Sequence, residues 1–202
     1  RHSHRLSSLI DKLCLPTLVI SDLDSAEPDG YHKAARPLRN KGLISSNYAI
    51  TDWLIKEKDL DKLIDLPAEK KEFTNETVYK YSIRIAYQTP IKVTFNETSN
   101  EALSSTFEDC MVYTNYELFK NFGESDDVGS LIKKIKNAID AEKTFDELHS
   151  EIYSVLRTGK SDLKAEFALD LIYAVEPIKL KVPQYIAEGL EWLQILLSPE
   201  EE

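Results

Sequence analysis

The stretch that decides the fold is Thr17-Leu18-Val19-Ile20, which runs directly into Ser21-Asp22-Leu23-Asp24-Ser25. Four consecutive apolar or β-branched residues without polar alternation predict a strand that is buried on both faces. Apolar residues at helical spacing between Leu6 and Leu13 predict an amphipathic helix just before it. A helix followed by a buried strand is typical of parallel sheets, so the sequence predicts an α/β fold with a mainly parallel sheet.

Asp22 and Asp24 follow this strand at spacing i, i+2. Open α/β sheets place their ligands at the carboxyl ends of strands, and two carboxylates there can turn toward one cation. Hard oxygen donors suit Mg²⁺ or Mn²⁺, with Ca²⁺ as a non-catalytic surrogate. The competing interpretation is a polar loop whose aspartates only cap the next element.

The rest of the chain alternates helical and extended patterns. Asn47 or Ser46 is expected to cap a helix that carries Ile50 and Leu54 inward. Residues 78–87 and 91–95 are expected to form strands, arranged as a hairpin. Further helices are expected from Thr106, over 128–140 and 145–156 as an inserted helical hairpin within 125–159, and over 161–173 and 183–197.

The charge balance narrows the class of function. The 202 residues carry 35 acidic against 25 basic side chains, a net charge of -10. Proteins that hold nucleic acid by bulk charge need a basic surface, so this class is disfavoured, whereas metal chemistry stays open. Two cysteines in apolar segments indicate free thiols rather than disulfides, and no apolar run could span a bilayer, so we expect a cytoplasmic domain without membrane contact.

Two later sites could complete a metal centre. In Thr106-Phe107-Glu108-Asp109, Thr106 and Asp109 fit a capping box, which leaves Glu108 in the first helical turn, free to face a cation. Lys164 falls in the first turn of a helix capped by Ser161, where a cation is disfavoured by about 0.3–1 kcal/mol. A facing anion such as a phosphate would offset that penalty. Lys164 could equally be a solvated surface residue, and Lys160 is its nearby competitor.

Five blocks of sequence resemble one known family in the order in which that family has them. The chain is similar to the TOPRIM nuclease domain of the OLD (overcoming lysogenization defect) family, which includes the Gabija phage-defence nuclease subunit. The resemblance covers most of the chain apart from the helical hairpin. The blocks are residues 15–25, Gly42-Leu43-Ile44-Ser45-Ser46-Asn47, residues 106–109, Lys164-Ala165-Glu166-Phe167-Ala168, and residues 182–193.

The resemblance implies a Rossmann-like TOPRIM core and two-metal cleavage of DNA. It assigns metal binding to Asp22, Asp24 and Glu108, with Asp109 as the alternative to Glu108, and stabilisation of the transition state to Lys164. It also implies an ABC-type ATPase domain in the same polypeptide, homo-oligomers of the full-length protein and a helicase as a possible partner. The family's first strand and its glutamate motif are expected upstream of Arg1, so this chain should lack them and should be inactive alone if the glutamate is essential.

Two other functions compete with a nuclease. Phosphotransferases of the haloacid dehalogenase type also place Asp-x-Asp after a strand, but a Gly-Thr or Gly-Ser pair normally follows, where this chain has Ala26 and Glu27. A catalytically inactive module for oligomerisation or partner binding is the alternative from another class.

Overall fold

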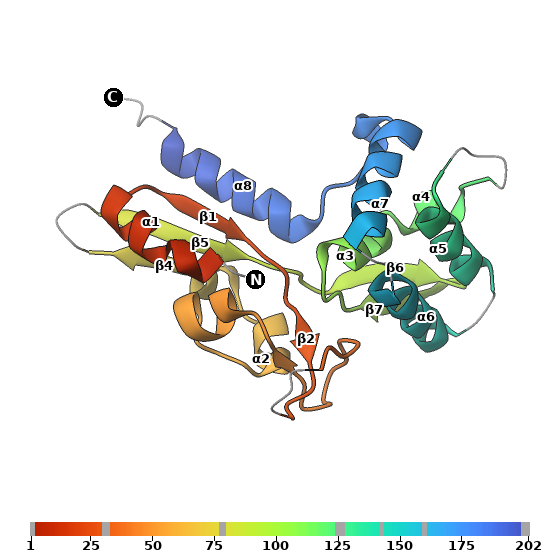
Figure 1. Ribbon diagram of the computed structural model, residues 1–202, viewed down its shortest axis with the longest axis horizontal. Helices are drawn as coiled ribbons and strands as arrows, with labels where there is room; N and C mark the ends of the chain where they lie inside the picture. Colours follow the sequence, from red (N-terminus) through yellow and green to blue (C-terminus); the bar gives the residue numbers. More distant parts are fainter. Residues whose placement is uncertain are drawn as a thin grey trace. The chain divides into compact units, whose positions relative to one another are not determined.

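The computed structural model describes residues 3–29, 33–76, 80–123, 128–141, 144–158 and 161–198 of a mixed α/β chain (Figure 1). The chain divides into two compact units. Unit 1 comprises Arg1–Thr89, Ser104–Thr106 and Pro183–Glu202, and unit 2 comprises Pro90–Leu103 and Phe107–Val182. Each unit is described below by itself. None of the described helices is long and apolar enough to cross a membrane.

Unit 1 is built on a small mixed sheet with strand order β1-β5-β4. β1 (Thr17–Ile20) runs parallel to β5 (Tyr81–Ala86), with Ile20 opposite Ala86. β4 (Glu72–Asn75) pairs antiparallel on the other side of β5. The strand predicted from residues 17–20 and its parallel pairing are confirmed, but the mainly parallel sheet is not, because one of the two pairings is antiparallel.

The prediction that β1 is buried on both faces is wrong. Only Val19 is buried, and Ile20 is 46% exposed. The physical reason is position, since among the described strands β1 has a neighbour on one side only. The strand that is closed in by neighbours on both sides is β5, whose Ile85 is fully buried.

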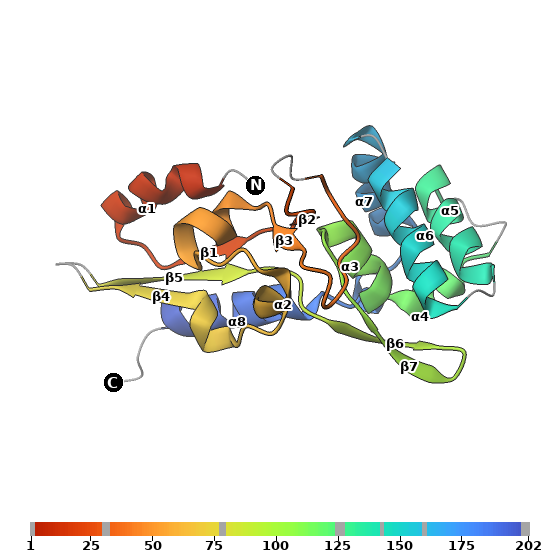
Figure 2. The ribbon, with the colours of Figure 1, turned by 90° about the horizontal axis from the view of Figure 1, so that it is seen from below.

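Helix α8 (Gln184–Leu197) packs against β1 and β5. Gly189 lies at the contact, where a Cβ would meet Leu18 Cδ1 at 2.9 Å and Ala86 Cβ at 3.3 Å. Figure 2 shows α1 (Ser7–Leu13), which follows the short 3₁₀ helix η1 (Ser3–Leu6), on the opposite side of the sheet from α8. The expected N-terminal helix therefore exists, but Leu6, Leu9 and Leu13 along it are exposed.

Short elements complete unit 1. Strands β2 and β3 pair antiparallel, with Ser25 opposite Ser45. The helix expected after Asn47 is a π-helix, η2, in which Ile50 and Leu54 are buried as predicted. The bounds are β2 Ser25–Ala26, β3 Ile44–Ser45, η2 Ala49–Leu54, α2 Leu60–Ile64 and η3 Ala68–Lys71.

Unit 2 begins with a β-hairpin that the sequence analysis placed wrongly. β6 (Ile91–Phe95) pairs with β7 (Thr98–Ala102), whereas the expected hairpin joined β6 to the preceding strand. Asn96 and Glu97 both have positive φ, 46° and 61°, as in the type I′ turns that match the twist of two-residue hairpins. β5 instead has β1 and β4 as its neighbours, so it has no free edge for β6.

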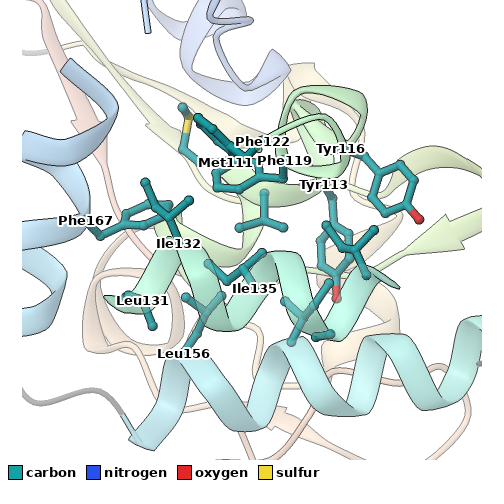
Figure 3. Close-up of a cluster of buried hydrophobic side chains, with 14 of the residues drawn as sticks. Met111, Tyr113, Tyr116, Phe119, Phe122, Leu131, Ile132, Ile135, Leu156 and Phe167 are labelled. Atoms are coloured by element: carbon teal, nitrogen blue, oxygen red, sulfur yellow. The ribbon is translucent and has the colours of Figure 1, made fainter. Parts of the chain in front are cut away.

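One hydrophobic core holds unit 2 together. Figure 3 shows side chains from its helices meeting in it, among them Phe119, Ile135 and Phe167. The expected helical hairpin is present as α5 and α6, and its apolar residues belong to this same core. The helix expected from Thr106 is divided at Asn115. The bounds are α3 Phe107–Thr114, α4 Tyr116–Lys120, α5 Ser130–Asp140, α6 Phe145–Thr158, α7 Ser161–Ala174 and η4 Pro177–Lys179.

Lys71 is a buried cation in unit 1. Its side chain lies with Nζ 4.3 Å from the ring centroid of Tyr87, and the residue is 7% exposed. The pKa of the Lys71 ammonium is lowered to about 8, and burial is the largest cause. The carboxylate of Glu188 partly opposes this shift, and the positive charge of Arg84 adds to it. The folded state therefore disfavours the charged form of this side chain.

Replacing Gly189 with valine should lower the free energy of unfolding by about 2–3 kcal/mol, because the new side chain would enter the space of Leu18 and Ala86. The matched control is Ala187→Val, on an exposed position of the same helix, which should cost less than about 1 kcal/mol. Urea unfolding of both variants measures this. Equal losses would mean that α8 does not pack closely on β1.

Replacing Lys71 with methionine should raise the free energy of unfolding at pH 7, on the order of 1–2 kcal/mol. Between pH 8 and 10.5 the folded amine is neutral while the unfolded amine still binds a proton, so the wild-type protein gains stability as the pH rises. The advantage of Lys71→Met should therefore shrink toward pH 10.5. Urea unfolding across this range checks it, and an advantage that does not change with pH would contradict it.

Candidate metal centre

The acidic segment continues directly from β1. Ser21 N–H donates to Ala86 O at 2.9 Å, which extends the pairing of β1 with β5 by one residue. Ser21, Leu23 and Ser25 are buried, whereas Asp22 and Asp24 are half-buried. Both aspartates are therefore partly exposed, while Leu23 between them is buried inside unit 1.

Asn47 holds the start of this segment. Its side chain is fully buried, and Nδ2 donates to Ser21 Oγ at 2.8 Å and to the carbonyl oxygen of Asp22. Oδ1 accepts from Ala49 N–H at 3.0 Å, at the start of η2. The predicted capping role of Asn47 is confirmed, and the same amide also fixes the backbone of Asp22.

Asp24 adopts a left-handed backbone conformation with φ 52°. Aspartate tolerates this region better than most residues do, although it costs free energy unless its surroundings compensate. Asp24 N–H donates to Ser105 O at 3.0 Å, and Asp24 O accepts from Ser46 N–H at 2.9 Å. Ser25 N–H donates to Ser105 Oγ at 2.8 Å. Hydrogen bonds on both sides thus hold the turn at Asp24.

The carboxylate of Asp22 has a buried amide as its partner. Gln88 Nε2 donates to Asp22 Oδ1 at 3.0 Å, and Gln88 Oε1 accepts from Leu23 N–H at 2.7 Å. Gln88 is 1% exposed. Sequence reasoning missed this residue, although a signal existed, because Gln88 follows β5 and the carboxyl ends of neighbouring parallel strands meet at one edge of a sheet.

The other two predicted residues are paired with each other in unit 2. Glu108, in the first turn of α3, accepts from Lys164 Nζ in the first turn of α7, at 2.9 Å. The side chains are 14% and 37% exposed. Glu108 therefore offsets the penalty for a lysine at a helix N-terminus. A bound phosphate is not needed to explain why Lys164 stands at this position. The competing Lys160 lies outside the described residues.

Asp109 is a weaker candidate ligand than Glu108. It is 4% exposed and its Oδ1 accepts from Cys110 N–H at 3.0 Å. Glu108 is the more accessible of the two carboxylates and the one beside Lys164. The geometry of unit 2 therefore favours Glu108 as the acid that this block would contribute.

The donor set of unit 1 fits a small divalent cation. Asp22 and Asp24 offer hard carboxylate oxygens, and Mg²⁺ in proteins is usually held by one or two carboxylates while it keeps several waters. Among the described residues, no group of three or more His, Cys, Asp or Glu side chains could hold a metal ion. Among the described residues of unit 1, Asp22 and Asp24 would therefore suit an open site in which waters complete the coordination of the ion.

A double-mutant cycle on Glu108→Gln and Lys164→Met should give a coupling energy of about 0.5–1 kcal/mol, as expected for a partly exposed ion pair. Each single variant should stay folded, because neither side chain belongs to the apolar core of unit 2. Urea unfolding of the four proteins provides the cycle. Additive effects of the two substitutions would show that the pair contributes no stability.

Comparisons of the chain with protein-family models, with curated proteins and with solved structures find no match. The OLD resemblance therefore rests on the sequence blocks themselves. What the structure adds is local: an acidic segment held by Asn47, Gln88 and Ser105 in unit 1, and the Glu108–Lys164 pair in unit 2.

Proposed function

We propose that this chain is the metal-dependent nuclease domain of an OLD-type ATPase–nuclease. One observation carries the proposal: two half-buried carboxylates, Asp22 and Asp24, stand at the carboxyl end of a strand on a segment whose backbone is fixed by buried amides. A loop that only had to be polar would not need its backbone held in this way or the Asp22 carboxylate oriented by a buried amide. Carboxylates on such a fixed segment suit Mg²⁺ or Mn²⁺ and the phosphates that these ions bind.

The resemblance places Glu108 and Lys164 in one site with the two aspartates, and the proposal takes that assignment from it. Within unit 2, the ion pair between Glu108 and Lys164 brings an acid and a base together.

The roles follow from the charge of each side chain. Asp22 and Asp24 would hold the cations, which supply activated water and stabilise the leaving oxygen of a phosphodiester. Glu108 would contribute a further carboxylate. Lys164 carries the positive charge that a scissile phosphate needs, and its Nζ lies beside Glu108.

The wider setting comes from the resemblance alone and belongs to the proposal. DNA would be the substrate, and an ABC-type ATPase domain would share the polypeptide, which would assemble into homo-oligomers in the cytoplasm and could work with a helicase. A net charge of -10 is unfavourable for holding DNA by bulk charge. We therefore expect DNA binding by this domain to depend on divalent metal.

A second candidate function is a partner-binding module, and one observation favours it. Unit 2 exposes large apolar side chains on α7 and after it, with Tyr173 85% and Ile178 90% exposed. Exposed apolar groups of this kind are typical of interaction surfaces. A module of this kind would bind its partner equally well without Asp22 and Asp24, which distinguishes the two functions.

The nuclease proposal predicts that the full-length protein relaxes supercoiled plasmid DNA in Mn²⁺ and that Asp24→Ala abolishes this activity. Lys164→Ala should keep Mn²⁺ binding while lowering the cleavage rate on the order of 10²–10³, as for other groups that face transition-state charge. Plasmid relaxation on gels measures the rate, and calorimetric titration measures Mn²⁺ affinity.

The matched control is Glu69→Gln, which removes an exposed acid of unit 1 that has no part in the acidic segment and should leave cleavage unchanged. Cleavage that survives Asp24→Ala, or no cleavage by the wild-type full-length protein, would contradict the proposal. Hydrolysis of a small phosphomonoester with phosphate trapped on Asp22, and no DNA cleavage, would favour the phosphotransferase interpretation.

A further inference from the structure

Gln88 is a buried amide whose orientation is fixed by its neighbours. Leu23 N–H is a donor and faces Gln88 Oε1 at 2.7 Å, so the opposite group of the amide must be the NH₂. That NH₂ donates to Asp22 Oδ1 at 3.0 Å and to Tyr185 Oη at 3.2 Å. The acceptor and both donors of the Gln88 amide are therefore engaged, and the amide cannot rotate without losing all three bonds.

The same side chain therefore touches both the backbone and the carboxylate of the acidic segment. Asn47 also contacts this segment, but it bonds Ser21 Oγ and the carbonyl of Asp22, not the carboxylate. Gln88 is 1% exposed, so water is poorly placed to replace it. Hydrogen bonds to an ionised acceptor are stronger than neutral ones, and burial strengthens them further.

From this geometry we propose that Gln88 is a positioning residue that presets the Asp22 carboxylate for a small divalent cation and so favours Mg²⁺ and Mn²⁺ over Ca²⁺. The proposal rests on the metal site proposed above. Mg²⁺ demands near-ideal octahedral geometry, whereas Ca²⁺ accepts flexible and variable coordination. A carboxylate locked in one orientation therefore benefits the smaller ions more, and outer partners of this kind typically account for 10–100-fold in metal affinity.

The link to Tyr185 extends this positioning to the last helix. Tyr185 is 4% exposed and lies in the first turn of α8, which packs on β1 and β5. Its hydroxyl accepts the second N–H of Gln88, which keeps the amide from turning toward other acceptors. Tyr185→Phe removes this contact but leaves the bond between Gln88 and Asp22, so its effect should be smaller than that of Gln88→Met. The matched control is Gln184→Met, which replaces an exposed amide of the same helix.

The first test compares calorimetric affinities of the wild-type chain, Gln88→Met, Tyr185→Phe and the control Gln184→Met for Mn²⁺ and Ca²⁺. Gln88→Met should weaken Mn²⁺ binding 10–100-fold and Ca²⁺ binding by much less, so that the ratio of the two affinities falls. Tyr185→Phe should lower that ratio by less than Gln88→Met does, and Gln184→Met should leave it unchanged. A purely structural role for Gln88 would weaken both ions together or neither, and an unchanged ratio in Gln88→Met overturns the proposal.

The second test needs no substitution and covers the case in which Gln88→Met does not fold. In an NMR titration of the wild-type chain with Mg²⁺, the side-chain amide of Gln88 should shift with the midpoint of metal binding. The buried amide of Asn115, which donates to Met111 O and Lys181 O, should not shift. A stationary Gln88 amide in a chain that binds Mg²⁺ refutes the role of Gln88 alone, whereas no metal binding by the wild-type chain refutes the metal site itself.

Discussion

The constraint on which unit 1 depends is that buried backbone groups must find hydrogen-bond partners. Between Ser21 and Ser25 the chain leaves the regular ladder of β1 and yet stays largely inside the unit. Its N–H and carbonyl groups are met by Gln88, Asn47 and Ser105, which come from three separate parts of the sequence. Asp22 and Asp24, the charged residues of this segment, are half-buried, so the hydrogen bonds that stabilise the fold also hold the backbone that carries both carboxylates. Gln88 in addition holds the carboxylate of Asp22.

The sequence correctly predicted the elements that depend on residues close together in the chain. The apolar run of β1, the paired stripes of α5 and α6, and the cap at Asn47 follow from residues close together in the sequence, and each is present. β4 was missed because Glu72–Asn75 carries no alternating apolar pattern. These residues form a strand because they pair with β5.

The errors share one cause, which is dependence on distant partners. The division between α3 and α4 coincides with Asn115, whose amide bonds the backbone of Lys181, 66 residues away. The strands expected as one hairpin belong to different sheets, because β5 pairs with β1 from far upstream. Within the candidate site, the acids could be predicted from their motif. Gln88 belongs to no motif, and its role is recognised only from its contact with Asp22.

The discontinuous make-up of unit 1 has a consequence for biosynthesis. A ribosome releases the sheet residues early, but α8 and Tyr185 emerge only after the whole of unit 2. Unit 2 is formed by an almost continuous stretch of chain and can fold as soon as that stretch is made. Unit 1 needs contacts between residues about a hundred positions apart, and contacts of such long sequence separation form slowly. The anchoring of Gln88 to Tyr185 is therefore among the last bonds to form, so a nascent chain cannot complete its acidic segment until translation has passed α8.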